Sequence, residues 1–214
     1  MWEFISERWQ TIAYDAYQHA SLVIQCVLLA TVIAVVLAAL IARRPLLEPL
    51  AGALSAIGLT VPTFALIGLM IPVSQLGAGT AVVVVTFYAV LPILRNAVVG
   101  LAGVDRSLVE SARGMGMNPL LTLVRVQLPL AWPVILAGIR VAMQMAMGVA
   151  AISAYVLGPG LGKYTFNALA SDGGANSMNQ ALIGVFGVVI IALVVDALLL
   201  LLGRVTISKG IRTA

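Results

Sequence analysis

Five long apolar runs restrict what this chain can fold into more than any other feature of its sequence. They cover about residues 20–41, 49–73, 78–101, 132–157 and 181–202. A helix of about 20 apolar residues crosses the roughly 30 Å hydrocarbon core of a bilayer. Only 9% of the 214 residues are charged, whereas soluble domains carry roughly 25%. The sequence therefore predicts an all-α polytopic membrane protein with five transmembrane helices in a single domain over residues 1–214.

A separate amphipathic helix is expected before the first run, over residues 1–18. Trp2, Ile5, Trp9 and Ile12 recur at intervals of three or four residues, so they share one helical face. Two tryptophans on that face favour an interfacial helix that lies along the membrane surface. The alternative is a frayed tail.

The third and fourth apolar runs are separated by a polar segment, residues 103–130. Its charged residues are Asp105, Arg106, Glu110, Arg113 and Arg125. Because charges are costly in hydrocarbon, a segment that carries this many between two spans has to face water.

Helix signals divide this polar segment, beginning with a short first helix. Asp105 or Ser107 can cap it, and Ser107 has the spacing to Glu110 of a capping box. Gly114 and Gly116 are expected to end it, since glycine adopts the left-handed conformation that ends many helices.

A second helix is expected to follow directly. Asn118 is a good capping residue, and Pro119 suits the first helical position, where a missing N–H costs nothing. Pro129 is expected to close this helix, because a proline inside a helix loses a hydrogen bond and clashes with the preceding turn.

Basic residues are distributed unequally between the two sides of the predicted bundle. One side has Arg8 and Lys163, whereas the other has Arg43, Arg44, Arg106, Arg113, Arg125, Arg204, Lys209 and Arg212. Cytoplasmic loops of membrane proteins carry an excess of lysine and arginine. The polar segment and the C-terminus are therefore predicted in the cytoplasm and the N-terminus outside. The net charge of +4 flanks membrane spans, so it does not indicate nucleic-acid binding.

Three charged residues, Arg95, Arg140 and Asp196, fall inside the predicted spans. Each lies eight residues from the cytoplasmic end of its span, which is a depth of roughly 12 Å in a helix. We expect Asp196 to pair with Arg140 or Arg95, because an isolated charge in hydrocarbon costs several kcal/mol. The alternative is that both arginines reach the inner headgroups while Asp196 faces a wet cavity.

The sequence contains no pattern that indicates an enzyme. The only histidine, His19, is expected to be an interfacial residue at the outer end of the first span. No spacing typical of a metal site occurs, and the glycine-rich residues 158–162 lack the lysine and serine or threonine of a phosphate-binding loop. We expect this chain to bind no cofactor, so energy for pumping would come from another polypeptide.

The polar segment resembles the EAA motif of permease subunits of ABC importers. The matching positions are Glu110, Ser111, Ala112, Gly116, Val126, Leu128 and Pro129. Ser111 and Val126 depart from the motif by small changes of size. The resemblance implies that residues 103–130, here called the coupling segment, form the coupling loop that docks into a groove on a cytoplasmic ATPase.

Further stretches resemble permeases of osmoprotectant importers for glycine betaine, carnitine, choline or similar quaternary amines. They are residues 42–45, 60–66, 91–96, 110–117 and 128–140. The resemblance implies a type I importer fold like that of the methionine permease, in the bacterial inner membrane. It also implies a second permease subunit, identical or different, two ATPase subunits that bind ATP and Mg²⁺, and an extracytoplasmic substrate-binding protein. Alternatives are an importer for another solute, such as an amino acid or a sulfonate, and a channel or scaffold without an ATPase partner.

Aromatic residues are scarce in the predicted spans. They are Phe64, Phe87, Tyr88, Tyr155 and Phe186. An aromatic cage favours a quaternary ammonium ion through cation–π attraction, so we expect selectivity to reside in the binding protein and the permease to offer a low-affinity path. Candidates for lining that path are Thr60, Tyr88, Gln144, Ser153 and Tyr155. Each could equally make a hydrogen bond between helices.

Overall fold

The computed structural model describes residues 1–42, 44–171 and 173–208, and their regular elements are helical, as the sequence predicts. The long helices are α1 (Trp2–Ile41), α4 (Ala78–Ala102), α7 (Leu128–Ser153) and α9 (Ser177–Thr206). The shorter helices are α2 (Glu48–Thr60), α3 (Thr63–Ser74), α5 (Arg106–Gly114), α6 (Pro119–Thr122) and α8 (Gly162–Ala170). Single turns are η1 (Pro45–Leu47) and η3 (Ala154–Val156), and a π-helical stretch, η2, covers Leu123–Gln127.

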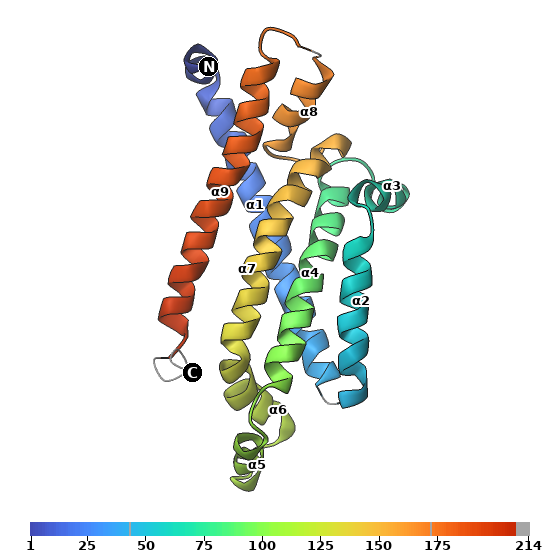
Figure 1. Cartoon of the computed structure of the whole chain (residues 1–214), viewed down its shortest axis with the longest axis vertical. Coiled ribbons are helices and arrows are strands. Elements are labelled where there is room, and N and C mark those ends of the chain that lie inside the picture. The colour runs from blue at the N-terminus through green and yellow to red at the C-terminus, as the bar shows by residue number, and fades with distance from the viewer. Residues whose placement is uncertain (43, 172, 209–214) are drawn as a thin grey trace.

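The core lies where α1, α4 and α7 pack together (Figure 1). Each of these helices places alanines with no exposed surface at intervals of four or eight residues, which keeps them on one face. They are Ala30, Ala34 and Ala38 of α1, Ala81, Ala89 and Ala97 of α4, and Ala142, Ala146 and Ala150 of α7. Small residues allow membrane helices to approach closely, so these alanines set the spacing of the central bundle.

Four single helices of the described chain are long and apolar enough to cross a membrane, and α2 with α3 makes a possible fifth span. Helices α2 and α3 meet at an angle of 92°. Pro62 lies at this break and holds Val61 in an extended conformation, as expected for a residue before proline. The hydroxyl of Tyr88 donates a hydrogen bond to the Val61 carbonyl, so this carbonyl at the break has a hydrogen-bond partner. The second predicted span is therefore two helices with a sharp bend.

The expected separate helix over residues 1–18 is wrong in one respect, because α1 runs without a break from Trp2 to Ile41. This stretch contains no glycine and no proline, so nothing in it interrupts the helix. Its 40 residues make a rod about 60 Å long, roughly twice the thickness of a hydrocarbon core. The change from polar to apolar residues near position 19 marks a change of surroundings and not the end of a helix.

Pro129 does not end a helix, contrary to the sequence-based expectation. Helical structure continues from Pro119 to Val156 through the π-helical stretch before Pro129. There the Leu128 N–H donates to the carbonyl of Leu123, five residues back. A π turn is wider than an α turn, and it removes the regular hydrogen-bond pattern that a proline would otherwise disrupt. The second helix of the coupling segment and the fourth span are thus one continuous element.

The two ends of the bundle have different architectures (Figure 1). Helices α5 and α6 form one end, here called the coupling end, and the C-terminal end of α9 points the same way. Helix α8 and η3 form the opposite end, here called the α8 end, near the N-terminus. Helix α8 lies in the stretch between the fourth and fifth predicted spans.

Candidate functional site

Asp105 caps α5, the first helix of the coupling segment. Its Oδ1 accepts a hydrogen bond of 2.8 Å from the Ser107 backbone N–H. This bond lowers the pKa of Asp105, because it stabilises the ionised carboxylate. Of the two predicted caps, Asp105 is therefore the one used, and Ser107 lies inside the helix.

Gly116 makes the turn between α5 and α6. Its φ of +85° lies in the region that L-residues avoid and glycine adopts freely. The Met117 N–H donates to the Ala112 carbonyl at 3.1 Å, and the Gly116 N–H donates to the Arg113 carbonyl at 2.9 Å. This pair of bonds is the Schellman arrangement that ends a helix. Nothing lies within 4 Å of the place that a Gly116 side chain would occupy, so only the backbone conformation requires glycine.

Asn118 caps α6, as the sequence predicts. Its Oδ1 accepts a hydrogen bond of 2.8 Å from the Leu121 N–H, and Pro119 occupies the first helical position. Of the motif positions on α5, Glu110 and Ser111 are exposed and Ala112 is 1% exposed. The remaining motif positions lie on the continuous α6–α7 element: Val126, Leu128 and Pro129. The coupling segment is thus a compact helical hairpin whose capping bonds are all local.

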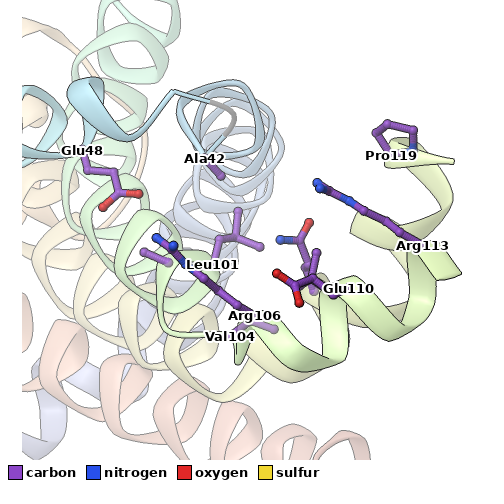
Figure 2. Close-up of a pocket in the computed structure, with 11 residues that line it drawn as sticks. Ala42, Glu48, Leu101, Val104, Arg106, Glu110, Arg113 and Pro119 are labelled. Carbon is purple, nitrogen blue, oxygen red and sulfur yellow. The ribbon is translucent and has the colours of Figure 1, made fainter. Parts of the chain in front are cut away.

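A cavity of about 660 Å³ lies between this hairpin and the ends of α1, α2 and α4 (Figure 2). Glu110 and Arg113 line it from α5, and Glu48 lines it from α2. Charges of both signs therefore face the space behind the hairpin. The motif residue Glu110 belongs to this inner wall as well as to the exposed surface of the segment.

The predicted ion pair of Asp196 is present, and its partner is Arg140. Arg140 donates from Nε to Asp196 Oδ1 at 2.8 Å and from Nη2 to Oδ2 at 2.9 Å. Two parallel bonds of this kind fix the relative orientation of both groups. They join α7 to α9, which packs along the edge of the bundle (Figure 1). Arg95 makes no ion pair with the residues that the structure describes, and it lines a cavity of about 350 Å³ with Leu59 and Val141.

The five candidates for the translocation path have different surroundings. Tyr88 is 3% exposed and Ser153 has no exposed surface, and their hydroxyls donate to the backbone carbonyls of Val61 and Ala150. In this conformation both hydroxyl groups therefore make hydrogen bonds within the protein. Thr60, Gln144 and Tyr155 are exposed on the bundle surface. That any of the five lines the path stays a prediction.

Sequence reasoning missed a polar cluster around a buried carboxylate at the α8 end, formed by Asp15, Lys163 and Tyr164. The Asp15 carboxylate is buried and accepts from Lys163 Nζ at 2.7 Å and from the Tyr164 hydroxyl at 2.8 Å. Burial raises the pKa of Tyr164, and the hydrogen bond to Asp15 raises it further. The only signal in the sequence is one acidic residue about one helical turn before His19, which does not identify partners 148 and 149 residues away.

His19 is fully buried, so its side chain does not face the membrane surface as expected of an interfacial residue. Gly160, with φ +117°, packs directly on it, and a Cβ at position 160 would lie 2.7 Å from His19 Nδ1. The loop before α8 therefore covers His19, and only glycine at position 160 leaves room for this contact.

Comparisons with known proteins agree on one family. Residues 30–207 match the family model of the binding-protein-dependent transport system inner membrane component. The choline transport system permease protein OpuBB of Bacillus subtilis is 34% identical over 98% of this chain and 95% of its own length. The osmoprotectant import permease protein OsmW of Salmonella typhimurium is 39% identical over 94% of each chain.

The carnitine transport permease protein OpuCB of Listeria monocytogenes is 34% identical over 99% of this chain and 95% of its own length. Among solved structures, an inward-facing form of the MetNI methionine ABC transporter superposes with a TM-score of 0.70 at 20% identity. That match covers 94% of this chain and 95% of the other. At this identity it shows a common fold and nothing about substrate, and it confirms the type I importer fold that the resemblance to osmoprotectant permeases implies.

Proposed function

The chain belongs to the family of binding-protein-dependent transport inner membrane components, as a permease subunit of an ABC importer, and we propose that its substrates are quaternary-amine osmoprotectants. The names of the relatives described above refer to the transport of choline, carnitine or osmoprotectants. Their similarity extends over nearly the whole chain, including the spans that would form the path. This full-length similarity is the observation that carries the substrate assignment.

The coupling segment is proposed to transmit the movement of the ATPase to the spans. Its hairpin is held by the caps at Asp105 and Asn118 and by the turn at Gly116. Helix α6 continues into α7 without interruption, so a displacement of the hairpin is passed directly to a helix of the core. We infer that Glu110, Ala112 and Gly116 keep the shape of this lever, while ATP binding and hydrolysis on the partner drive alternating access.

The basic residues support an orientation with the coupling end in the cytoplasm. Arg106 and Arg113 lie on α5, Arg125 lies just after α6, and Arg204 lies in the last turn of α9. Of the others counted for this side, Arg43, Lys209 and Arg212 lie outside the described residues. In this orientation the α8 end meets the extracytoplasmic binding protein, and a second permease subunit completes the path.

Transport by the reconstituted importer tests this proposal. The permease would be co-expressed with its ATPase and placed in proteoliposomes, with purified binding protein outside and ATP inside. We expect ATP-dependent uptake of radiolabelled glycine betaine, carnitine or choline. Failure of the ATPase to co-purify would contradict the coupling role. Uptake of an amino acid or a sulfonate, without uptake of any quaternary amine, would contradict the substrate assignment.

A further inference from the structure

Three aromatic side chains from three separate elements meet at the α8 end. Phe64 comes from the first turn of α3, Tyr155 from η3 and Phe166 from α8. The ring centroids of Phe64 and Tyr155 are 5.5 Å apart with the rings at 90°. Those of Tyr155 and Phe166 are 5.8 Å apart with a 51° tilt. Tyr155 is therefore the middle ring of a continuous aromatic cluster, which we call the Tyr155 cluster.

Two of the three side chains of the Tyr155 cluster are exposed, unlike those of the buried aromatic residues. Phe64 is 53% exposed and Tyr155 is 64% exposed, Phe166 is half-buried, and Tyr88 is 3% exposed. Packing of the core therefore accounts for Tyr88 but leaves the exposure of Phe64 and Tyr155 unexplained. Exposed aromatic side chains that lie close together and at different angles can contact one small ligand at the same time.

Local backbone structure fixes the positions of these rings. The break at Pro62 directs α3 across the bundle at 92° to α2, which places Phe64 beside η3. The Gly77 N–H donates to the Val156 carbonyl at 2.7 Å, so the loop between α3 and α4 is tied to η3. The contact between Phe64 and Tyr155 thus rests on two separate constraints.

We propose that the Tyr155 cluster is a binding site for the quaternary ammonium group of the substrate on the permease itself. This inference rests on the proposed function and adds a site to it. The face of an aromatic ring attracts a cation, and several rings around one centre are the arrangement that recognises quaternary ammonium groups. With exposed rings the attraction is weak, which suits a site that receives the substrate and passes it on.

The basic side chain on α8 does not oppose a bound cation with an unpaired charge. Lys163 lies three residues before Phe166 on α8, so both are on neighbouring positions of one helix. Its ammonium group is 2.7 Å from the Asp15 carboxylate, which offsets its charge. The charge of Lys163 is therefore paired, and the aromatic rings can contribute the attraction.

An aromatic belt at the membrane surface is the competing explanation, since tyrosine and tryptophan gather there. A belt would contact apolar and charged small molecules without preference. A cation site requires the positive charge, so it should distinguish choline from its neutral carbon analogue, in which a tert-butyl group replaces the trimethylammonium group. The two molecules have nearly the same shape, which isolates the contribution of charge.

The test measures contact directly, on the permease–ATPase complex in nanodiscs without binding protein. Saturation-transfer NMR would report contact between the protein and the methyl protons of choline or of the neutral analogue. We expect a signal for choline that is about tenfold weaker in a Phe64→Leu/Tyr155→Leu variant, because two exposed cation–π contacts are lost. Tyr155→Phe should keep the signal. Phe186→Leu is the matched control, because Phe186 is also exposed, at 57%, but lies on α9.

Equal signals for choline and the neutral analogue would overturn the inference in favour of an apolar surface. Absence of a choline signal, or an unchanged signal in the leucine variant, would overturn it as well. Uptake in proteoliposomes with the same preparation keeps the two claims separate. If quaternary amines are taken up but do not contact the cluster, only this inference fails, and if none is taken up the proposed function fails.

Discussion

The coupling end and the α8 end of this permease hold their geometry by different means. At the coupling end, the bonds that shape the hairpin join residues at most five positions apart, such as Met117 to Ala112. At the α8 end, Asp15 contacts Lys163 and Tyr164, which are 148 and 149 positions away. The first end is therefore shaped by local rules, and the second by packing between distant parts of the chain.

This difference suits the tasks proposed for the two ends. Helix α5 buries little of its surface, and Ala112 is its buried residue, so few side-chain contacts hold the hairpin back and its displacement passes to the core through α7. The α8 end is tightly packed: a Cβ on Gly162 would lie 2.0 Å from the Ala151 carbonyl oxygen. A lever requires internal stiffness and few side contacts with the bundle, whereas a fixed end requires close tertiary contact.

The largest expected effect is at the α8 end, in Gly162→Ala. A side chain there meets the backbone of α7, which cannot move aside without shifting the helix. We expect a loss of about 3 kcal/mol in stability, the upper end for overpacking, seen as a lower thermal midpoint in detergent. Gly148→Ala is the control on α7, since nothing lies within 4 Å of that position. Equal midpoints for the two variants would mean that the α8 end is not closely packed.

Asp15→Ala should have the second largest effect. It leaves the hydroxyl of Tyr164, a residue that is 6% exposed, without its acceptor. An unsatisfied buried group costs about 1–3 kcal/mol, whereas the Lys163 side chain is 44% exposed and can be hydrated. Thermal unfolding should show the loss. In a Tyr164→Phe background the same substitution should cost less, and an undiminished cost would contradict this account of the cluster.

The same cluster predicts a dependence on alkaline pH. Because the folded-state pKa of Tyr164 is raised, first by burial and then by Asp15, its contribution to stability is complete below the unfolded pKa of about 10 and falls as pH rises above it. Unfolding measured between neutral and alkaline pH should show this loss. Tyr164→Phe should make stability less dependent on pH in this alkaline range. An unchanged dependence would show that Tyr164 does not cause the loss.

Sequence reasoning succeeded where structure is decided locally. Gly116 and Asn118 are predicted correctly as turn and cap, and Asp105 is one of the two predicted caps, because each acts on backbone groups within five residues. The pairing of Asp196 with an arginine was also predictable, since charges at equal depth on neighbouring helices need partners. Which arginine it contacts depends on how the helices pack, which the sequence does not specify.

The failures concern long-range contacts and continuity of helices. His19 is expected at the interface because the sequence around a lone histidine beside an apolar run does not indicate that a distant loop, through Gly160, will cover it. The sequence predicts two helices in place of α1 because its polarity changes, although no residue in it ends a helix. The sequence predicts a helix end at Pro129 because nothing in it indicates the π-helical turn that accommodates this proline.

At the coupling end, Gly116→Ala tests whether the shape of the hairpin is needed for coupling. A left-handed backbone costs an L-residue about 1–2 kcal/mol, so the turn should distort while the spans stay folded. We expect substrate-stimulated ATPase activity to fall severalfold at an unchanged amount of permease in the membrane. Gly114→Ala is the control, because Gly114 lies in α5 with open space around it. Wild-type stimulation in Gly116→Ala would contradict the lever.

The smallest expected effect separates two asparagines at the starts of helices. Asn118 caps α6 through its side chain, whereas Asn176 precedes α9 without a side-chain capping bond. Asn118→Ala should cost about 1 kcal/mol, which makes the Leu121 amide exchange with solvent roughly fivefold faster, because opening of this hairpin is local. Asn176→Ala should leave exchange at the start of α9 unchanged. If both substitutions accelerate exchange equally, the coupling end is not stabilised by its own caps, and its stiffness has to come from contacts with the bundle.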